Sequence, residues 1–405
     1  MPDVDGVCRH FGVCGGCAAQ DQPYTQQLAA KGEAVRALLG DAWPHPIPVT
    51  PSPDVWHYRN KVDLTFARRY YDAPPPPDFD RETVLGFTRK GRWFQPLEIA
   101  ECRIGPEGLG GLLDAVRGWQ RASGEQAFDT RTKAGRLKVL LVRVGKRTGE
   151  CMVVLLTGPG VGGLDGFVEA VHSAWPGAAV HHAVSHSHAG AAFAESSTVL
   201  AGSAHIEERL RIGEGGETPR ELRFRLSPFS FFQTNTRATE LLYGHLRARL
   251  RAHAPRRLYD LYGGMGSIAF SCADLVDCCE SVESVAAASE DGRANAETNG
   301  IDNVTFITAK VKNYLKEREV RDMPFEADSL AIVDPPRAGM TPKALRRLVG
   351  LAPPMILYVS CKPLIFARDE WPSFAARYAL AGVRVFDLFP HTPHAEVVAE
   401  LVRRD

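Results

Sequence analysis

The sequence predicts an α/β protein with a strand-rich first half and a second half built as a parallel sheet with helices. From about Leu222 onward, apolar strand patterns alternate with helical patterns, which is typical of a parallel sheet. From roughly residue 56 to 215 the pattern indicates strands, interrupted by the surface loop DAPPPPDFD. Because 405 residues exceed one ordinary core of roughly 150 residues, we expect two domains, residues 1–215 and residues 216–405.

Composition indicates a globular protein of the cytoplasm. Hydrophobic residues make up 44% of the chain and charged residues 24%, as in average globular proteins. The N-terminus MPDVDGVCRH lacks a secretion signal, and no apolar run reaches the roughly 18 residues of a membrane span, so we expect no membrane partner. We expect a monomer. In the cytoplasm nine cysteines stay reduced, which leaves packing, metal binding or catalysis as their roles.

Basic residues are clustered although the formal net charge is zero. The stretch RTKAGRLKVLLVRVGKR, residues 131–147, has seven basic residues and no acidic one, with Arg136 and Lys138 on one face of a strand. WHYRNKVDLTFARRYY and TRKGRW interleave aromatic rings with basic side chains. Either stretch alone fits a solvated sheet face. Together they favour RNA, because aromatics stack on unpaired bases while cations hold phosphates.

The N-terminus carries a cysteine motif followed by a helix. Cys8, Cys14 and Cys17 have Cx5CxxC spacing in a glycine-rich loop, and Cys102 in IAECRIG is a distant fourth candidate ligand. Four thiolates hold either zinc or an iron–sulfur cluster, and spacing does not choose between them. YTQQLAAKGEAVRALLG is a helical pattern that ends at Gly40. We expect the remaining cysteines apart from that in YVSC to be packing residues: Cys151, Cys272, Cys278 and Cys279.

A glycine turn in the second half predicts a nucleoside site. In RRLYDLYGGMGSIAFSCA an apolar strand leads into Gly263, Gly264 and Gly266 and then into a helix, so the backbone can pass close to a ligand. Glu283 ends the next strand, where a ribose hydroxyl pair is held. This pattern fits NAD and S-adenosylmethionine equally well.

Two further strands end on reactive side chains. AIVDPPRAGM has Asp334 at the end of a buried strand, before a stiff Pro-Pro turn. MILYVSC ends on Cys361. Taken singly these are an ordinary β-turn and a buried free cysteine. Because carboxyl ends of parallel strands share one edge of a sheet, we expect Glu283, Asp334 and Cys361 to open onto one crevice.

Five motifs in order, FSFFQTN, DLYGGMG, VDPPRAG, YVSCKP and FPHTPHAE, resemble the signature of the RNA uracil-5 methyltransferase family, which forms 5-methyluridine from S-adenosylmethionine. YRNKVDLTFA and the cysteine motif resemble the non-catalytic half of its rRNA-modifying members. The resemblance implies a Rossmann-like class I methyltransferase domain, preceded by an N-terminal cysteine-cluster segment and a β-rich RNA-binding domain.

The resemblance also implies residue roles. Cys361 would be the nucleophile and Glu396 the general base, with His391 and His394 more simply interpreted as surface or core residues. Thiolate addition at C6 of uracil would make C5 nucleophilic enough to accept a methyl group. The cysteine motif would hold a [4Fe-4S] cluster through Cys8, Cys14, Cys17 and Cys102. Cofactor-binding positions would be Gln233, Tyr262, Gly264, Ser267, Glu283 and Asp334.

Within the family as characterised, the cysteine motif implies a 23S rRNA substrate. A tRNA T-loop uracil is the alternative, and a non-catalytic RNA-binding protein of the same fold is another. A dinucleotide oxidoreductase explains neither VDPPRAG nor the thiol. The chain departs from the pattern at Gly263, where cysteine is common, at Lys310 and Lys312, where an acid is common, and at Lys362 after the nucleophile. We expect Lys362 to lower the thiol pKa.

Overall fold

The structure, a computed structural model, describes residues 6–73, 75–76, 79–160, 164–187, 194, 196–213 and 218–404. The chain divides into two compact units. The first unit comprises residues 1–22, 55–208 and 226–229. The second unit comprises residues 23–54, 209–225 and 230–405. No helix in the described ranges is long and apolar enough to cross a membrane.

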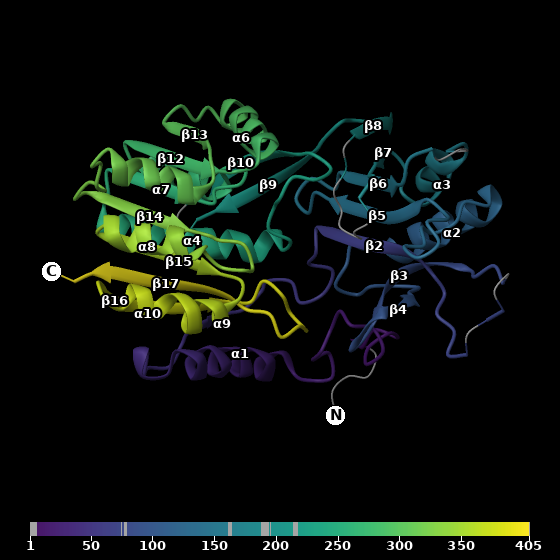
Figure 1. The fold of residues 1–405 in the computed structure, drawn as a ribbon, viewed down its shortest axis with the longest axis horizontal. Coiled ribbons are helices and arrows are strands. Elements are labelled where there is room, and N and C mark those ends of the chain that lie inside the picture. Colours follow the sequence, from purple (N-terminus) through teal and green to yellow (C-terminus); the bar gives the residue numbers. More distant parts are fainter. Residues whose placement is uncertain are drawn as a thin grey trace. The chain divides into compact units, whose positions relative to one another are not determined.

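The first unit is built on a seven-stranded sheet in the order β4-β3-β2-β5-β6-β7-β8 (Figure 1). All neighbours in it are antiparallel except β6 and β7. Its strands are β2 (Lys61–Arg68), β3 (Thr83–Arg89), β4 (Arg92–Glu98), β5 (Leu137–Val144), β6 (Cys151–Thr157), β7 (Ala179–Val184) and β8 (Ser196–Ala201).

Two helices pack on this sheet, α2 (Leu109–Ser123) and α3 (Phe167–Ala174). Their buried faces, including Leu112, Val116 and Phe167, join the strands in one hydrophobic core. The strand-rich interpretation of residues 56–215 is therefore confirmed for the sheet, but it did not include these helices. In α2 the helical spacing of apolar residues is interrupted by glycines, which weakens the pattern in the sequence.

The second unit is built on an eight-stranded sheet in the order β1-β16-β17-β15-β14-β11-β12-β13. The strands from β15 to β13 are parallel, and β17 runs antiparallel to both β15 and β16. The strands are β1 (Val49–Thr50), β11 (Arg257–Leu261), β12 (Cys278–Glu283), β13 (Val304–Thr308), β14 (Ser329–Val333), β15 (Met355–Ser360), β16 (Tyr378–Phe386) and β17 (Glu396–Arg403).

Helices flank this sheet, and a separate two-stranded sheet pairs β9 (Ile206–Ile212) with β10 (Arg220–Leu226). The α-helices are α1 (Tyr24–Leu39), α4 (Thr236–His253), α5 (Ser267–Cys272), α6 (Ala286–Thr298), α7 (Val311–Val320), α8 (Pro342–Leu351), α9 (Pro363–Ile365) and α10 (Trp371–Phe374). A π-helical turn, Phe366–Glu370, lies between α9 and α10.

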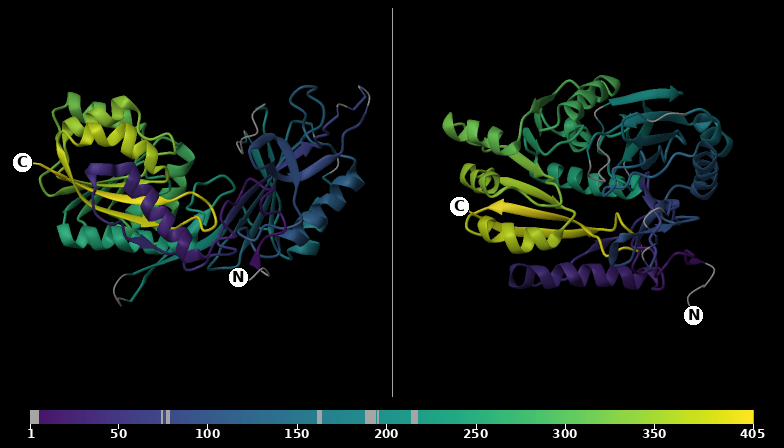
Figure 2. Two further views of the ribbon diagram at one scale, coloured as in Figure 1. Left: turned by 90° about the horizontal axis from the view of Figure 1, so that it is seen from below. Right: turned by 45° about the vertical axis from the view of Figure 1, so that its right-hand side comes forward.

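Helix α1 belongs to the second unit, so the expected boundary at residue 215 is too simple. The helix ends where the sequence predicts, with Gly40 as its C-cap. Its Val35 and Leu39 are buried in the core of the second unit. After it, Val49 of β1 pairs in parallel with Val385 of β16. Figure 2 shows α1, in purple, alongside the yellow C-terminal strands.

Candidate active site

The candidate thiol and base lie at adjacent strand ends. Cys361 directly follows β15, every residue of which is buried. Glu396 is the first residue of β17. The antiparallel register pairs Ser360 with Val397, so Cys361 and Glu396 are the next residues at that end of the two strands. The sequence predicted a strand end for Cys361 but made no such prediction for Glu396.

Acidic neighbours keep the Cys361 thiol protonated. Burial raises its pKa to about 11, and the charges of Glu396 and Asp334 raise it as well. Arg337 acts in the opposite direction. The expectation for Lys362 is wrong in this respect: Lys362 is exposed, and its charge acts on Asp369. The cation that matters most to the thiol comes from the Pro-Pro turn.

Glu396 is a buried carboxyl group with an unused oxygen. Its side chain is 1% exposed, and Oε1 has no hydrogen-bond partner in the described part of the chain. Burial raises the pKa of Glu396 well above its usual range, and the charge of Asp334 adds to this. A buried carboxyl without a full set of partners is costly, which makes Glu396 a candidate functional residue.

Two further carboxyl groups, those of Asp260 and Asp334, lie near the ends of β11 and β14. Burial raises the pKa of Asp260 in β11 to about 7, although Ser281 Oγ donates to its Oδ2 over 3.1 Å. Burial and the Asp260 charge raise the pKa of Asp334 to about 7. Asp334 follows β14, and its backbone N–H donates to Leu261 O over 3.2 Å. These groups therefore titrate close to neutral pH.

The glycine turn after β11 has a left-handed backbone conformation at three positions. Tyr262, Gly264 and Gly266 all have positive φ, at 69°, 57° and 83°. A Cβ on Gly263 would lie 2.1 Å from Ser281 Oγ, which explains why glycine occupies this position in this chain. The backbone N–H of Gly264 donates to Glu283 Oε2 over 3.2 Å. The turn is thereby tied to the predicted ribose-binding acid.

Of the two remaining predicted cofactor positions, Ser267 directly follows this turn and Gln233 lies in a different segment. Ser267 is the first residue of α5, and its Oγ lies 2.8 Å from the hydroxyl of buried Tyr243. The carboxylates of Asp334, Asp260 and Glu396 raise the pKa of Tyr243 after the larger effect of burial. Gln233 is buried in the segment before α4. Tyr243 was not identified in the sequence analysis.

The Pro-Pro turn after β14 is fixed by Glu370, which the sequence analysis also missed. Glu370 accepts hydrogen bonds from the Met340 amide over 2.5 Å and from the Tyr358 hydroxyl. Tyr358 belongs to β15, the strand that Cys361 follows. The buried carboxyl of Glu370 therefore joins the turn to this strand. A small depression beside Cys361 is lined by this turn and by residues 360–362.

The two histidines of the FPHTPHAE motif have different surroundings. His391 is buried, has a φ of 65°, and contacts Gln27. His394 is exposed, and its Nδ1 lies 3.5 Å from Arg337 Nη2. This agrees with their interpretation as one core and one surface residue.

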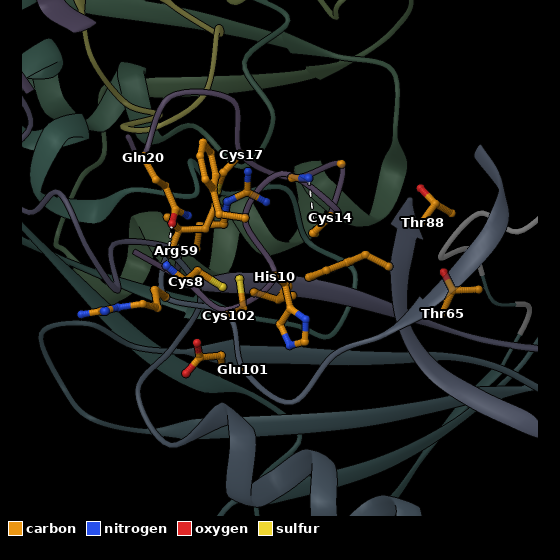
Figure 3. A pocket seen from close by; sticks show the side chains of 17 residues that line it. Cys8, His10, Cys14, Cys17, Gln20, Arg59, Thr65, Thr88, Glu101 and Cys102 are labelled. Atoms are coloured by element: carbon orange, nitrogen blue, oxygen red, sulfur yellow. Dashed lines mark hydrogen bonds between the residues drawn. The ribbon is translucent and has the colours of Figure 1, made fainter. Parts of the chain in front are cut away.

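The cysteine motif forms a separate cavity within the first unit. Cys8, Cys14, Cys17 and Cys102 all line one cavity of about 310 Å³, together with His10, Glu101 and Arg59 (Figure 3). Among the described residues no group of three or more side chains is arranged to hold a metal ion. The thiols share a cavity but do not form a preassembled site.

Burial disfavours the thiolate form of these cysteines, whereas Arg59 and two backbone N–H groups favour it. Burial raises the pKa of Cys17 to about 11 and also raises those of Cys14 and Cys102. Arg59 lowers the pKa of all three. Backbone N–H groups of Gly105 and Ile104 act in the same direction on Cys102. The four cysteines set aside as packing residues lie elsewhere: Cys272 and Cys279 are buried, and Cys151 and Cys278 are half-buried.

Two cations of the long basic stretch have structural roles. Lys138 is buried, and its ammonium donates to the carbonyl oxygens of Ser185 and Ser187. Arg143 is 1% exposed and donates to Ser227 O over 2.5 Å. The prediction that Arg136 and Lys138 share an RNA-binding face is therefore wrong for Lys138, because its ammonium group is already hydrogen-bonded to carbonyl oxygens of the first unit.

The β3–β4 hairpin presents a different surface. Trp93 is 84% and Phe94 54% exposed, and the Phe94 ring contacts that of Tyr70 at 6.0 Å between centroids. Arg89 and Lys90 are exposed at the hairpin turn. The turn is also paired with the cysteine segment, since Gly15 N donates to Thr88 O over 3.1 Å and Lys90 N to Val13 O over 2.8 Å.

Comparisons with known proteins agree with this geometry. A family model described as tRNA (Uracil-5-)-methyltransferase matches residues 191–404. A protein of Caldanaerobacter subterraneus named as an uncharacterized RNA methyltransferase is 33% identical, covering 98% of this chain and 85% of the relative. A second such protein, of Chlorobaculum tepidum, is 33% identical over 98% of this chain and 83% of its own length.

A solved structure extends the similarity to three dimensions. The Pyrococcus abyssi tRNA (uracil-54, C5)-methyltransferase, in complex with S-adenosyl-L-homocysteine, has a TM-score of 0.72 and is 26% identical. The match covers 96% of this chain and 86% of that one. The expected class I methyltransferase fold is thus confirmed. The chain belongs to the tRNA (uracil-5-)-methyltransferase family and is an S-adenosylmethionine-dependent RNA methyltransferase.

Proposed function

We propose that the protein methylates C5 of a uridine in 23S rRNA, with Cys361 as nucleophile and Glu396 as general base. The observation that carries the proposal is the placement of these two groups as neighbours at the ends of β15 and β17. The thiol is half-buried and the carboxyl is fully buried, so both react in a site that water enters only partly.

The groups supply a balanced reaction. The Cys361 thiolate forms a bond to C6 of uracil, and the C5=C6 electron pair moves toward the carbonyl to give an enolate. S-adenosylmethionine supplies the methyl group, which C5 takes as the sulfonium leaves as a neutral thioether. Glu396 then removes the C5 proton, the C5=C6 bond re-forms, and the thiolate is expelled. This removal of the C5 proton requires an ionised Glu396.

The surroundings of Cys361 and Glu396 determine which of these groups is protonated before the reaction begins. Burial raises the pKa of both Glu396 and Cys361, and the charge of Asp334 adds to the rise in each, so the resting protein holds them protonated. Activation therefore releases protons, and the rate should rise with pH. Arg337 opposes this for the thiol, because its positive charge stabilises the thiolate.

S-adenosylmethionine would bind over the glycine turn. Glu283 is positioned for ribose hydroxyls, and its Oε2 already accepts from Gly264 N. Asp334, Ser267, Tyr262 and Gln233 complete the proposed set. The close approach that a Cβ on Gly263 would block is consistent with backbone packed tightly beneath the cofactor.

RNA contact is assigned to the β3–β4 hairpin, a narrower region than the strands from residue 56 to 147 as a whole. In those strands the Arg68 and Arg69 side chains are already paired with Asp80, Glu82 and Glu98. Exposed Trp93 and Phe94 instead offer ring faces beside the cations of the hairpin turn. Such a surface stacks unpaired bases and attracts phosphates.

We further propose that the four thiols hold a [4Fe-4S] cluster with a structural role. The shared cavity supports it because it brings the four thiols together, and the Arg59 charge and the N–H groups directed at Cys102 support it because they stabilise thiolate ligands. A bound cluster would fix the segment that pairs with the hairpin turn. Anaerobically purified protein should contain about four irons per chain and be brown. Stoichiometric zinc without iron would contradict the cluster.

Two kinds of RNA are candidates for the substrate. The cysteine motif resembles rRNA-modifying members, whereas the solved neighbour is titled as a tRNA (uracil-54, C5)-methyltransferase. A tRNA T-loop uracil is therefore the second candidate. Purified enzyme should transfer labelled methyl groups to protein-free 23S rRNA fragments in a salt-sensitive manner. Labelling of tRNA with no labelling of any 23S fragment would select the second candidate.

A further inference from the structure

The loop that precedes the proposed general base, Glu396, has little regular structure of its own. Residues 387–395 join β16 to β17 and lead directly into Glu396. Asp387, His391 and Thr392 in this loop are buried. His391 has a φ of 65°, a left-handed conformation that side chains other than glycine rarely adopt without outside support. Contacts from other elements must therefore hold the loop in place.

Lys31 of α1 supplies the first contact. Its ammonium donates to Asp387 Oδ1 over 2.6 Å and to Phe389 O over 2.9 Å. The Lys31 side chain is 6% exposed and that of Asp387 0%. The same Asp387 oxygen accepts from the Phe389 amide over 3.2 Å. One buried ion pair thus fixes the entrance of the loop.

Gln27 of α1 supplies the second contact, one helical turn earlier. Its Oε1 accepts from the His391 amide over 2.9 Å, and its Nε2 lies 3.2 Å from His391 Nδ1. A single amide therefore engages both the backbone and the ring of the residue with positive φ. This is a specific support for the strained position in the loop.

The pattern on α1 shows that these contacts are built into the helix. Gln27, Lys31, Val35 and Leu39 are all buried and recur every four residues, which places them on one face. The latter two enter the hydrophobic core. The former two are polar groups at positions where an apolar residue would be expected, and both point to the same loop.

We propose that Gln27 and Lys31 are positioning residues for catalysis, and that α1 holds the loop so that Glu396 reaches the C5 proton. The proposal rests on the proposed function, in which Glu396 is the base. A general base works only within hydrogen-bond reach of its proton. Loss of either contact lets the loop shift and slows proton removal, while thiol addition by Cys361 and methyl transfer continue.

The test compares Gln27→Leu and Lys31→Met with Gln26→Leu in the full-length protein. Gln26 is exposed on the same helix, so its variant controls for helix effects. In the first two variants kcat should fall about ten- to a hundredfold with KM for RNA little changed. A covalent protein–RNA adduct should accumulate on denaturing gels, and Lys31→Arg should restore part of kcat. A simple loss of folded enzyme would lower adduct and turnover together.

Glu396→Gln, measured alongside, separates the two claims. If it loses turnover while folded Gln27→Leu and Lys31→Met keep the wild-type rate, the positioning role is wrong and the base assignment stands. If Glu396→Gln turns over normally, the base assignment is wrong and the positioning role is overturned with it. Should Gln27→Leu fail to fold, Gln27→Asn gives the same readout, because its amide is too short to reach both atoms of His391. Adduct accumulation in it supports the proposal, and a wild-type rate overturns it.

Discussion

Two buried cations of the first unit and two buried carboxyls of the second unit differ in whether the atoms that carry their charge are hydrogen-bonded. In the first unit, Lys138 and Arg143 are buried, and each donates to backbone carbonyl oxygens. In the second unit, Glu396 Oε1 and Asp260 Oδ1 are buried with no hydrogen-bond partner in the described part of the chain. Burying a polar group is tolerated when it is bonded and costly when it is not.

This difference separates structure from chemistry. The satisfied cations serve the fold of the first unit, although their sequence pattern suggested RNA. The unsatisfied carboxyls lie together at the strand ends where Cys361 follows β15, and their pKa values are raised. Groups left without partners are available to a substrate, so the predictions below contrast the two kinds of site.

The largest effect is expected at the thiol. Cys361→Ala should abolish methyl transfer while S-adenosylmethionine binding persists, because the thiol acts on the uracil ring and not on the cofactor. Labelled methyl incorporation and calorimetric cofactor binding measure the two properties. Near wild-type incorporation in this variant would refute the covalent mechanism.

The next effect concerns the base. Glu396→Gln should lower turnover by about 10² to 10⁴, the usual contribution of a positioned general base. Because addition and methylation precede proton removal, a covalent protein–RNA adduct should accumulate. The same gel run with Cys361→Ala, which cannot form the adduct, is the control. Normal turnover would place the base elsewhere.

The sequence predicted the chemistry better than its supports. Parallel strands bring their carboxyl ends to one edge, so Asp334, Glu283 and Cys361 could be grouped from strand patterns alone. The cysteine motif could likewise be read from spacing. Lys31 and Glu370 could not, because the partners of buried polar residues depend on tertiary packing; Lys31 and Asp387 are 356 residues apart in the sequence.

Local patterns also misled where packing overrides composition. Seven basic residues in residues 131–147 suggested a binding face, yet a long cation can cross a sheet edge and donate to carbonyl oxygens inside the unit. Lys362 is adjacent to Cys361 in sequence but exposed, whereas Arg337 reaches the thiol's surroundings from another strand end. Proximity along the chain is a weak guide to electrostatics.

A satisfied cation should affect stability and leave chemistry intact. Arg143→Met removes the buried charged donor to Ser227 O, which should lower the free energy of unfolding by about 2 kcal/mol. The kcat at a temperature where the variant is folded should stay near wild type. Denaturant unfolding and methylation rates check the two parts, and a large loss of kcat in folded protein would contradict a structural role.

The exposed aromatic hairpin should affect RNA affinity alone. Trp93→Ala removes one stacking surface and should weaken RNA binding about tenfold, within the range for a single stacked base. The kcat at saturating RNA should be unchanged. Phe79→Ala, which removes another exposed ring of the first unit, is the matched control. Equal effects of the two variants would mean that the hairpin is not the contact surface.

The smallest effect is a shift in pH dependence. Arg337 lowers the pKa of the Cys361 thiol, so Arg337→Gln should raise that pKa and move the rising limb of the pH–rate profile to higher pH. The shift should be below about one pH unit, since an opposite charge near a partly solvated group contributes modestly. Lys362→Asn, at the exposed neighbouring position, should leave the limb nearly in place. Rates of adduct formation across alkaline pH compare the two variants, and a larger shift for Lys362→Asn would return the electrostatic role to the residue next to the thiol in the sequence.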